Sequence, residues 1–95
     1  MGAYQTTQRD PSHQLNVRLL RYRRSPDRED PALLAQDLLA HGRALDAIEL
    51  TDIALRRDPG DADLELLRAR ALLAAGHVQH GERELIRVAK ATPDW

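Results

Sequence analysis

A shift of 34 residues superimposes most of this chain on itself. Residues 28–61 then align with residues 62–95, and identical residues meet at seven positions. The pairs are Leu33 with Leu67, Ala35 with Ala69, Leu38 with Leu72, Leu39 with Leu73, Ala40 with Ala74, Gly42 with Gly76, and Pro59 with Pro93. They make up an apolar ridge, a glycine after it and a proline near the end of each copy. A period of this length predicts a repeated supersecondary unit.

Both copies carry the signals of two helices joined by a tight turn. Asp30-Pro31 supplies an N-cap residue followed by a proline at the first helical position, and Asp61 supplies the same cap in the second copy. The segment "DPGD" at residues 58–61 separates the copies, because proline and glycine stop a helix. We therefore predict an all-α chain whose helices run from Asp30 to Gly42, from about Ala44 to Arg57, from about Ala62 to Ala75, and from about Val78 to Thr92.

Residues 1–27 form a basic segment ahead of the repeats. Asp10-Pro11 is a possible helix start, and Leu15, Leu19 and Tyr22 follow at helical spacing. Leu15, Val17 and Leu19 also alternate as a strand would, so the segment is ambiguous, and we favour the helix. Two repeats cannot cover both ends of their own stack. We expect this helix to close the first end with the apolar residues Leu15, Leu19, Leu20 and Tyr22.

The sequence resembles two tetratricopeptide repeats, at residues 28–61 and 62–95. In the first unit the resemblance rests on Leu34-Ala35, Leu38, Gly42, Ala47 and Ala54, and in the second on Ala69, Leu72, Gly76, Gly81 and Pro93. The chain departs from the family pattern at four positions. Pro31 and Glu65 occupy a slot that is usually aromatic, Arg68 replaces a leucine, and Thr51 replaces a large apolar residue. We expect weakened helix–helix contacts at these positions.

The resemblance implies an adaptor or scaffold module that binds other proteins. In this family the first helices of successive units line a concave groove in which a peptide or helix docks. The matching residues here are Gln36, Leu39, Leu66, Arg70 and Leu73. Leu39, Leu66 and Leu73 would anchor an apolar segment, and Gln36 and Arg70 would orient it. The alternative is that Leu66 and Leu73 pack against the N-terminal cap.

A second possible binding surface is the basic arm. Residues 1–28 hold six arginines and two aspartates, a net charge of +4, whereas residues 29–95 hold eight basic and thirteen acidic residues, a net charge of −5. Arginines around an aromatic ring can bind phosphates while the ring stacks on a base. The alternative function is thus an arm that binds nucleic acid or an acidic surface. The acidic body disfavours nucleic acid, because the arginines can face the repeats instead. The arm residues are Arg18, Arg21, Tyr22, Arg23 and Arg24.

No residue pattern supports catalysis, a cofactor or a metal. The sequence has no glycine-rich phosphate loop and no nucleophile beside a base. His77 and His80 have a spacing that metal sites use, and Glu84 is the one further ligand nearby. In the other copy, however, Arg43 and Asp46 stand at the positions of the two histidines, so we expect them on a variable, solvent-facing surface. We predict no enzyme and no metal site.

The remaining expectations concern location and assembly. The sequence contains no cysteine and no apolar run long enough to span a bilayer, which favours a cytoplasmic protein. The chain stops at a unit boundary with "ATPDW". This suggests either a piece of a longer repeat protein or a Trp95 side chain that folds back as a lid. An uncovered end of the second repeat would also permit self-association.

Overall fold

The computed structural model describes residues 11–91, in which every regular element is helical. The elements are α2 (Pro11–Arg24), the 3-10 helix η1 (Pro26–Arg28), α3 (Pro31–Ala40), α4 (Ala44–Arg57), α5 (Ala62–Ala74) and α6 (Val78–Ala91). This confirms the predicted all-α fold and the choice of a helix over a strand after residue 10. The helix predicted to reach Gly42 ends two residues early, at Ala40, and the helix predicted to reach Ala75 ends one residue early, at Ala74. Asp10 as a cap, Thr92 as a helix end, Pro93 as a terminator and Trp95 as a lid lie outside the described residues.

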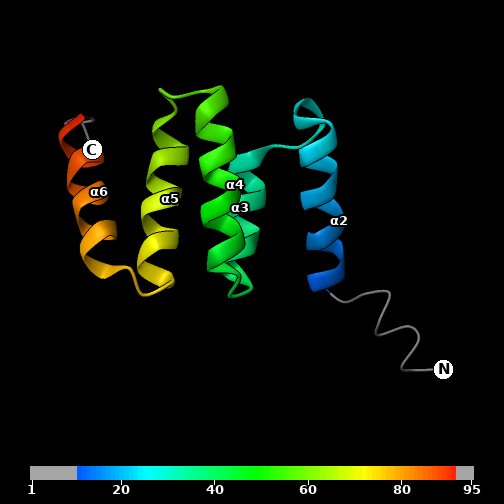
Figure 1. The fold of residues 1–95 in the computed structure, drawn as a ribbon, viewed down its shortest axis with the longest axis horizontal. Coiled ribbons are helices and arrows are strands. Elements are labelled where there is room, and N and C mark those ends of the chain that lie inside the picture. Colours follow the sequence, from blue (N-terminus) through cyan, green and yellow to red (C-terminus); the bar gives the residue numbers. More distant parts are fainter. Residues whose placement is uncertain (1–10, 92–95) are drawn as a thin grey trace.

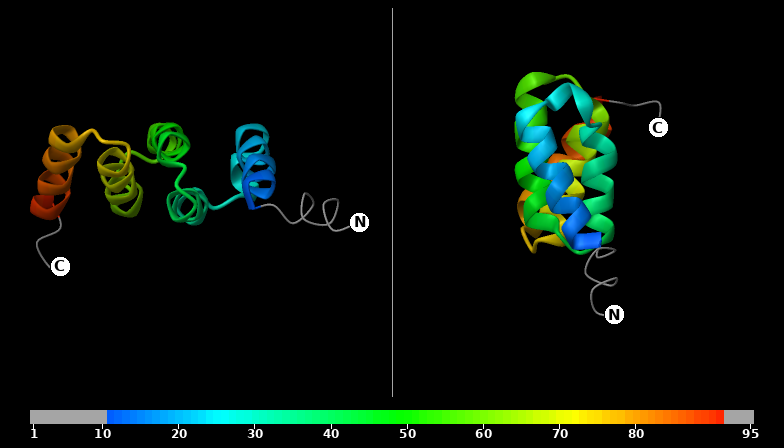
Figure 2. Two further views of the ribbon diagram at one scale, coloured as in Figure 1. Left: turned by 90° about the horizontal axis from the view of Figure 1, so that it is seen from below. Right: turned by 90° about the vertical axis from the view of Figure 1, so that its right-hand side faces the viewer.

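The helices form a single row in which each one runs antiparallel to the next (Figure 1). Seen along the helices, α3 and α4 lie on opposite sides of the row (Figure 2). The helix α2 stands beside α3 at one end of the row, and α6 stands at the opposite end. The row measures 53 × 28 × 21 Å. This elongated arrangement leaves large helix faces exposed for the size of the chain.

The two first helices of the repeats begin in the same way. Asp30 precedes α3, and its carboxylate accepts a hydrogen bond from the backbone N–H of Ala32 at 2.9 Å. Asp61 precedes α5, and its carboxylate accepts one from the backbone N–H of Leu64 at 3.1 Å. Each cap satisfies an N–H group that has no partner within the helix. The aspartates therefore fix where α3 and α5 start.

These two helices also end through the same turn. Gly42 and Gly76 have φ angles of +72° and +91°, in the left-handed region that favours glycine. The residue that follows each glycine then donates its N–H to a carbonyl oxygen in the last turn of the helix, as in a Schellman motif. These bonds are Arg43 to Leu38 at 2.8 Å and His77 to Leu72 at 2.9 Å. The glycines that the two copies share thus make equivalent turns into α4 and α6.

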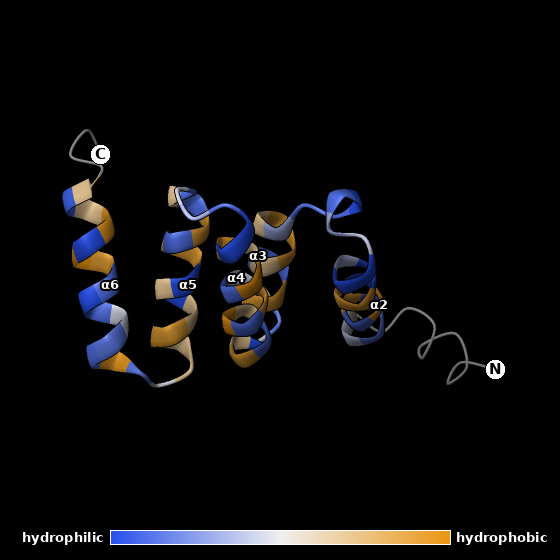
Figure 3. Cartoon of the chain, turned by 45° about the horizontal axis from the view of Figure 1, so that its top comes forward, coloured by the Kyte–Doolittle hydropathy of each residue, from blue (hydrophilic) through white to orange (hydrophobic). Residues whose placement is uncertain are grey.

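Aliphatic side chains from α2 to α5 form one core. Figure 3 shows how apolar residues dominate α3, the helix between α2 and α4. Leu15, Leu19 and Tyr22 of α2 join this core, as the sequence predicts. Leu20 does not, because it projects from the other side of α2 and is 56% exposed. The core residues are Leu15, Leu19, Tyr22, Leu34, Ala35, Leu38, Ala47, Leu50, Ala54, Leu64, Leu67 and Ala71.

Thr51, which replaces a large apolar residue of the family pattern, is fully buried. Its hydroxyl donates to the backbone carbonyl of Ala47 at 2.8 Å and lies 3.0 Å from the carbonyl of Ile48. A buried hydroxyl is costly only when it lacks such a partner. The substitution therefore leaves no unsatisfied polar group in α4.

Candidate protein-interaction surface

The first helices of the two repeats, α3 and α5, pack on each other and present a shared surface. Each helix carries exposed residues spaced by three, four or seven positions, so that they lie along one side of the helix. We call this surface the α3/α5 face. Its exposed residues are Leu33, Gln36 and Ala40 on α3, and Asp63, Arg70 and Ala74 on α5.

The five residues predicted to bind a partner differ in how accessible they are. Gln36 and Arg70 are exposed, and Leu39, Leu66 and Leu73 are half-buried. Within residues 11–91, Arg70 forms no ion pair, unlike Arg68 two positions earlier. A free guanidinium on an apolar helix is available to a partner. The two polar side chains of the predicted set are therefore accessible, while the three leucines are accessible only in part.

Leu73 has a structural contact that the sequence does not predict. A Cβ atom built on Gly81 would lie 2.7 Å from Cγ of Leu73, so the leucine side chain lies directly against the backbone of α6. Leu39 similarly packs against the main core. The alternative in which Leu73 packs against the N-terminal cap is wrong, because its side chain contacts α6 at the other end of the row.

Leu33 is an accessible residue of the α3/α5 face that is missing from the predicted set. Its side chain is 54% exposed, whereas Leu67, its counterpart one repeat later, is 3% exposed. The helix α5 has α3 beside it, but in the described part of the chain no first helix of an earlier repeat stands beside α3. The sequence could have identified Leu33 as part of this face, because the spacing of Leu33, Gln36 and Ala40 puts them on one side of a helix.

Two arginines of the predicted basic arm form ion pairs with other helices or turns of the same chain. Arg18 donates to Glu29 at 2.7 Å and to Asp37 at 2.6 Å. The hydrogen bond to Asp37 is the largest cause that raises the pKa of Arg18. Arg23 of α2 pairs with Glu49 of α4. These bonds hold α2 against the acidic body, as one of the two sequence interpretations predicts.

Tyr22 cannot stack on a nucleic-acid base, which corrects that part of the arm hypothesis. Its side chain is 2% exposed and belongs to the core. Burial raises the pKa of its hydroxyl, because the charged form would lose its hydration. Arg21 and Arg24 remain exposed. In the described part of the chain, the basic arm is thus a packed helix, and Arg21 and Arg24 are accessible on its outer side.

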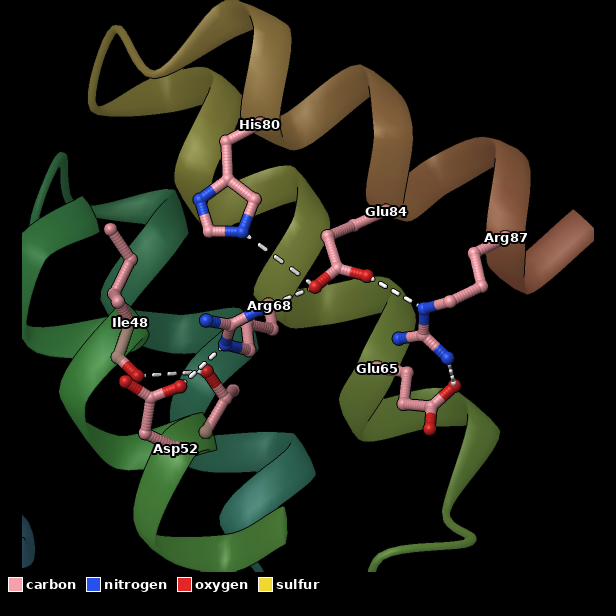
Figure 4. A network of polar contacts seen from close by, with 8 residues as sticks. Ile48, Asp52, Glu65, Arg68, His80, Glu84 and Arg87 are labelled. Atoms are coloured by element: carbon pink, nitrogen blue, oxygen red, sulfur yellow. Dashed lines mark hydrogen bonds and ion pairs between the residues drawn. The ribbon is translucent and has the colours of Figure 1, made fainter.

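A chain of ion pairs connects α4, α5 and α6 (Figure 4). Arg68 of α5 bonds to Asp52 of α4 and, at 2.9 Å, to Glu84 of α6. Glu84 also accepts from Arg87 at 2.8 Å, and Arg87 lies 3.3 Å from Glu65. Arg68 replaces the leucine of the family pattern. The weakened contact expected there is therefore not what the structure shows, since one guanidinium bridges both neighbouring helices.

Glu84 makes part of the stability of this network depend on pH. Burial acts to raise the pKa of Glu84, but the bonds to Arg87 and Arg68 outweigh it and lower the pKa below its ordinary value of 4.5. A carboxylate with a lowered pKa stabilises the fold above the ordinary value, and this contribution is lost as the pH falls through the lower, folded-state pKa. The wild type should lose stability in that acidic range.

We expect Glu84→Gln to be less stable than the wild type at neutral pH and to show a shallower decline towards about pH 3. Urea unfolding at several pH values measures this difference. Glu82→Gln is the matched control, because Glu82 is exposed on the same helix and makes no ion pair within residues 11–91. Parallel pH profiles for the wild type and Glu84→Gln would contradict the assignment.

His77 and His80 are both exposed at the start of α6, as the sequence predicts. His80 Nε2 lies 3.7 Å from Glu84 Oε1, and that carboxylate is already bonded to Arg68. The described residues contain no group of three or more potential ligands close enough to hold a metal ion. His80 lies at the top of the network in Figure 4.

The geometry defines a class of protein: a row of antiparallel helix pairs with repeated caps and turns is a helical-repeat protein. A sequence model of the tetratricopeptide repeat matches residues 38–95, and the chain belongs to that family. Domains of this family generally mediate protein–protein interaction and are typically not enzymes. The search of curated proteins and the search of solved structures each found no match. None of the helices in residues 11–91 is both long and apolar enough to cross a membrane.

Proposed function

We propose that this chain is an adaptor module that binds an extended or helical segment of a partner protein on the α3/α5 face. The observation that carries the proposal is the pairing of two exposed polar side chains, Gln36 and Arg70, with apolar residues on adjacent helices. Apolar side chains of a partner would cover Leu33 and Leu66, and Arg70 would bond to its backbone carbonyls or a carboxylate. We place this activity in the cytoplasm, which suits the cysteine-free sequence.

The variant Leu66→Asp/Arg70→Glu tests this face directly. It puts two negative charges at the proposed contact, and we expect capture of the partner to fall at least tenfold, since truncating a binding hot spot costs about 2 kcal/mol. Leu73 is left unchanged, because its contact with Gly81 would confuse loss of binding with loss of fold. Affinity capture followed by mass spectrometry measures the effect.

The matched control for this experiment is Arg83→Glu. Arg83 is exposed on α6, away from the α3/α5 face, and makes no ion pair within the described part of the chain. This variant should capture the same proteins as the wild type. If Leu66→Asp/Arg70→Glu keeps its helical circular dichroism and still captures them equally well, the α3/α5 face is not the binding surface.

Self-association through α6 is a second contact that we include in the proposal. Ile86 is 55% exposed and stands 34 residues after Asp52, the α4 residue that bonds to the next helix, α5. Its side chain is therefore on the side of α6 where a further repeat, or a second copy, would pack. Light scattering of the wild type over a range of concentrations tests whether copies associate.

A further inference from the structure

The outer side of α2 and the η1 turn that follows it carry apolar side chains next to arginines. Val17 and Leu20 are 41% and 56% exposed, although both are aliphatic. They line a hollow of about 420 Å³ together with four polar residues, none of which is acidic. Positions along this hollow are spaced by three or four, so they follow one side of the helix. We call this surface the α2 strip; its residues are Val17, Leu20, Arg21, Arg24, Ser25 and Arg28.

The α2 strip corresponds to the side of α4 that packs on another helix, which indicates that a helix can pack on the strip. A shift of 33 residues superimposes α2 on α4, helices of equal length, and Pro26 on Pro59. The same shift places Val17 on Leu50 and Leu20 on Ile53. In α4 those two residues face a helix, because they line a narrow gap together with Leu19 and Tyr22 of α2. The α2 strip is therefore the equivalent docking side on a helix that stands one repeat earlier in the chain.

The charge of the α2 strip indicates an acidic occupant. Among residues 11–91, Arg24 and Arg28 make no ion pair. Arg21 lies 3.7 Å from Glu29, a carboxylate that is more closely bonded to Arg18 at 2.7 Å. Three guanidinium groups thus lie beside Val17 and Leu20, and carboxylates of the described residues neutralise little of their positive charge.

The contact between α2 and α4 inside the protein has the same chemistry. There, apolar packing is flanked by an ion pair between Arg23 and Glu49. A helix that packs on the α2 strip would reproduce this contact if it carried carboxylates beside an apolar stripe.

We propose that the α2 strip binds an amphipathic acidic α-helix of a partner protein. Leucine or isoleucine side chains of that helix cover Val17 and Leu20, and its Asp or Glu residues pair with Arg24 and Arg28. A single-stranded nucleic acid fits less well, because Tyr22 is buried and the centre of the strip is aliphatic. The strip runs from α2 through Ser25 to η1 and shares no residue with the α3/α5 face.

The test uses the full chain and two fluorescein-labelled peptides. One peptide is a designed amphipathic helix with leucine along one side and glutamate elsewhere, and the other has lysine in place of every glutamate. Fluorescence anisotropy at about 0.15 M salt measures both affinities, because screening at that ionic strength removes weak long-range attraction. We expect the glutamate peptide to bind and the lysine peptide not to bind.

Substitutions locate the contact. Arg24→Gln/Arg28→Gln should weaken the glutamate peptide at least tenfold, and Leu20→Ser should weaken it several-fold, since Leu20 is an exposed anchor. We choose glutamine rather than glutamate because a negative charge at Arg24, in the last turn of α2, would interact unfavourably with the helix dipole. Arg83→Glu on α6 is the control and should bind the glutamate peptide as the wild type does.

Three kinds of result would overturn the proposal. The first is equal binding of the two peptides, or wild-type affinity in Arg24→Gln/Arg28→Gln. The second is a single-stranded oligonucleotide that binds more tightly than the glutamate peptide and is lost in the same variant, which would assign the strip to nucleic acid. The third is a dimer in sedimentation that dissociates in that variant, which would assign the strip to a second copy of the chain.

Discussion

Replacing Gly81 by leucine is expected to separate α6 from α5 and to lower the free energy of unfolding by about 3 kcal/mol. An added Cβ would lie 2.7 Å from Cγ and 2.8 Å from Cδ2 of Leu73. It would also lie 3.1 Å from the backbone nitrogen of Leu73, which cannot move unless α5 moves with it. Leucine is a better helix former than glycine by about 0.8 kcal/mol, so the packing cost must exceed that gain.

Urea unfolding followed by circular dichroism measures this loss, and Gly60→Ala provides the control. Nothing lies within 4 Å of a Cβ added at Gly60. That variant should therefore unfold within about 0.5 kcal/mol of the wild type. If Gly81→Leu were as stable as Gly60→Ala, the close approach of α6 to Leu73 would be disproved.

Tyr22→Ala should have a comparably large effect at the other end of the row, where we expect a loss of about 3 kcal/mol. Tyr22 is 2% exposed and is the largest side chain that α2 contributes to the core. Its removal leaves Leu15 and Leu19 to hold the helix in place. Because each helix in a stack of this kind contacts only nearby helices, the loss should be concentrated in α2.

Hydrogen exchange distinguishes such local release from general destabilisation. In Tyr22→Ala, amide protection should fall most in Pro11–Arg24 and much less in α5 and α6. Trypsin should also cleave α2 faster, since the peptide bonds after Arg18, Arg21 and Arg23 become accessible when the helix unfolds. Leu20→Ala is the matched control, because this leucine is exposed and lies outside the core. Uniform loss of protection along the chain would contradict an anchoring role that is local to α2.

The fold was largely predictable from the sequence because its determinants are local. Asp30 and Asp61 cap the helices that follow them, and Gly42 and Gly76 make the same left-handed turn. Each of these residues acts on backbone groups within a few positions. An alignment of the chain with itself therefore locates helix starts and ends to within about two residues, without knowledge of the tertiary structure.

The contacts between helices were less predictable, because the repeat pattern gives the position of a residue in its helix but not the residues of the neighbouring helices that it contacts. Arg68 departs from the pattern, and only the structure shows that Asp52 and Glu84 lie on either side to receive it. Leu73 was expected to face a partner, but the absence of a side chain at Gly81 lets it pack on α6. Arg68 depends on partners sixteen positions away, and Leu73 depends on a glycine eight positions away, in each case on another helix.

The succession of contacts between nearby helices also bears on how quickly the chain can fold. The main helix contacts join α2 to α3, α3 to α4, α4 to α5 and α5 to α6, with one further contact between α3 and α5. No extensive contact within residues 11–91 requires the two ends of the row to meet. Low contact order of this kind is associated with folding in microseconds to milliseconds, on the order of the fastest helical domains. A helix pair can thus form early and serve as the nucleus on which the next helix assembles.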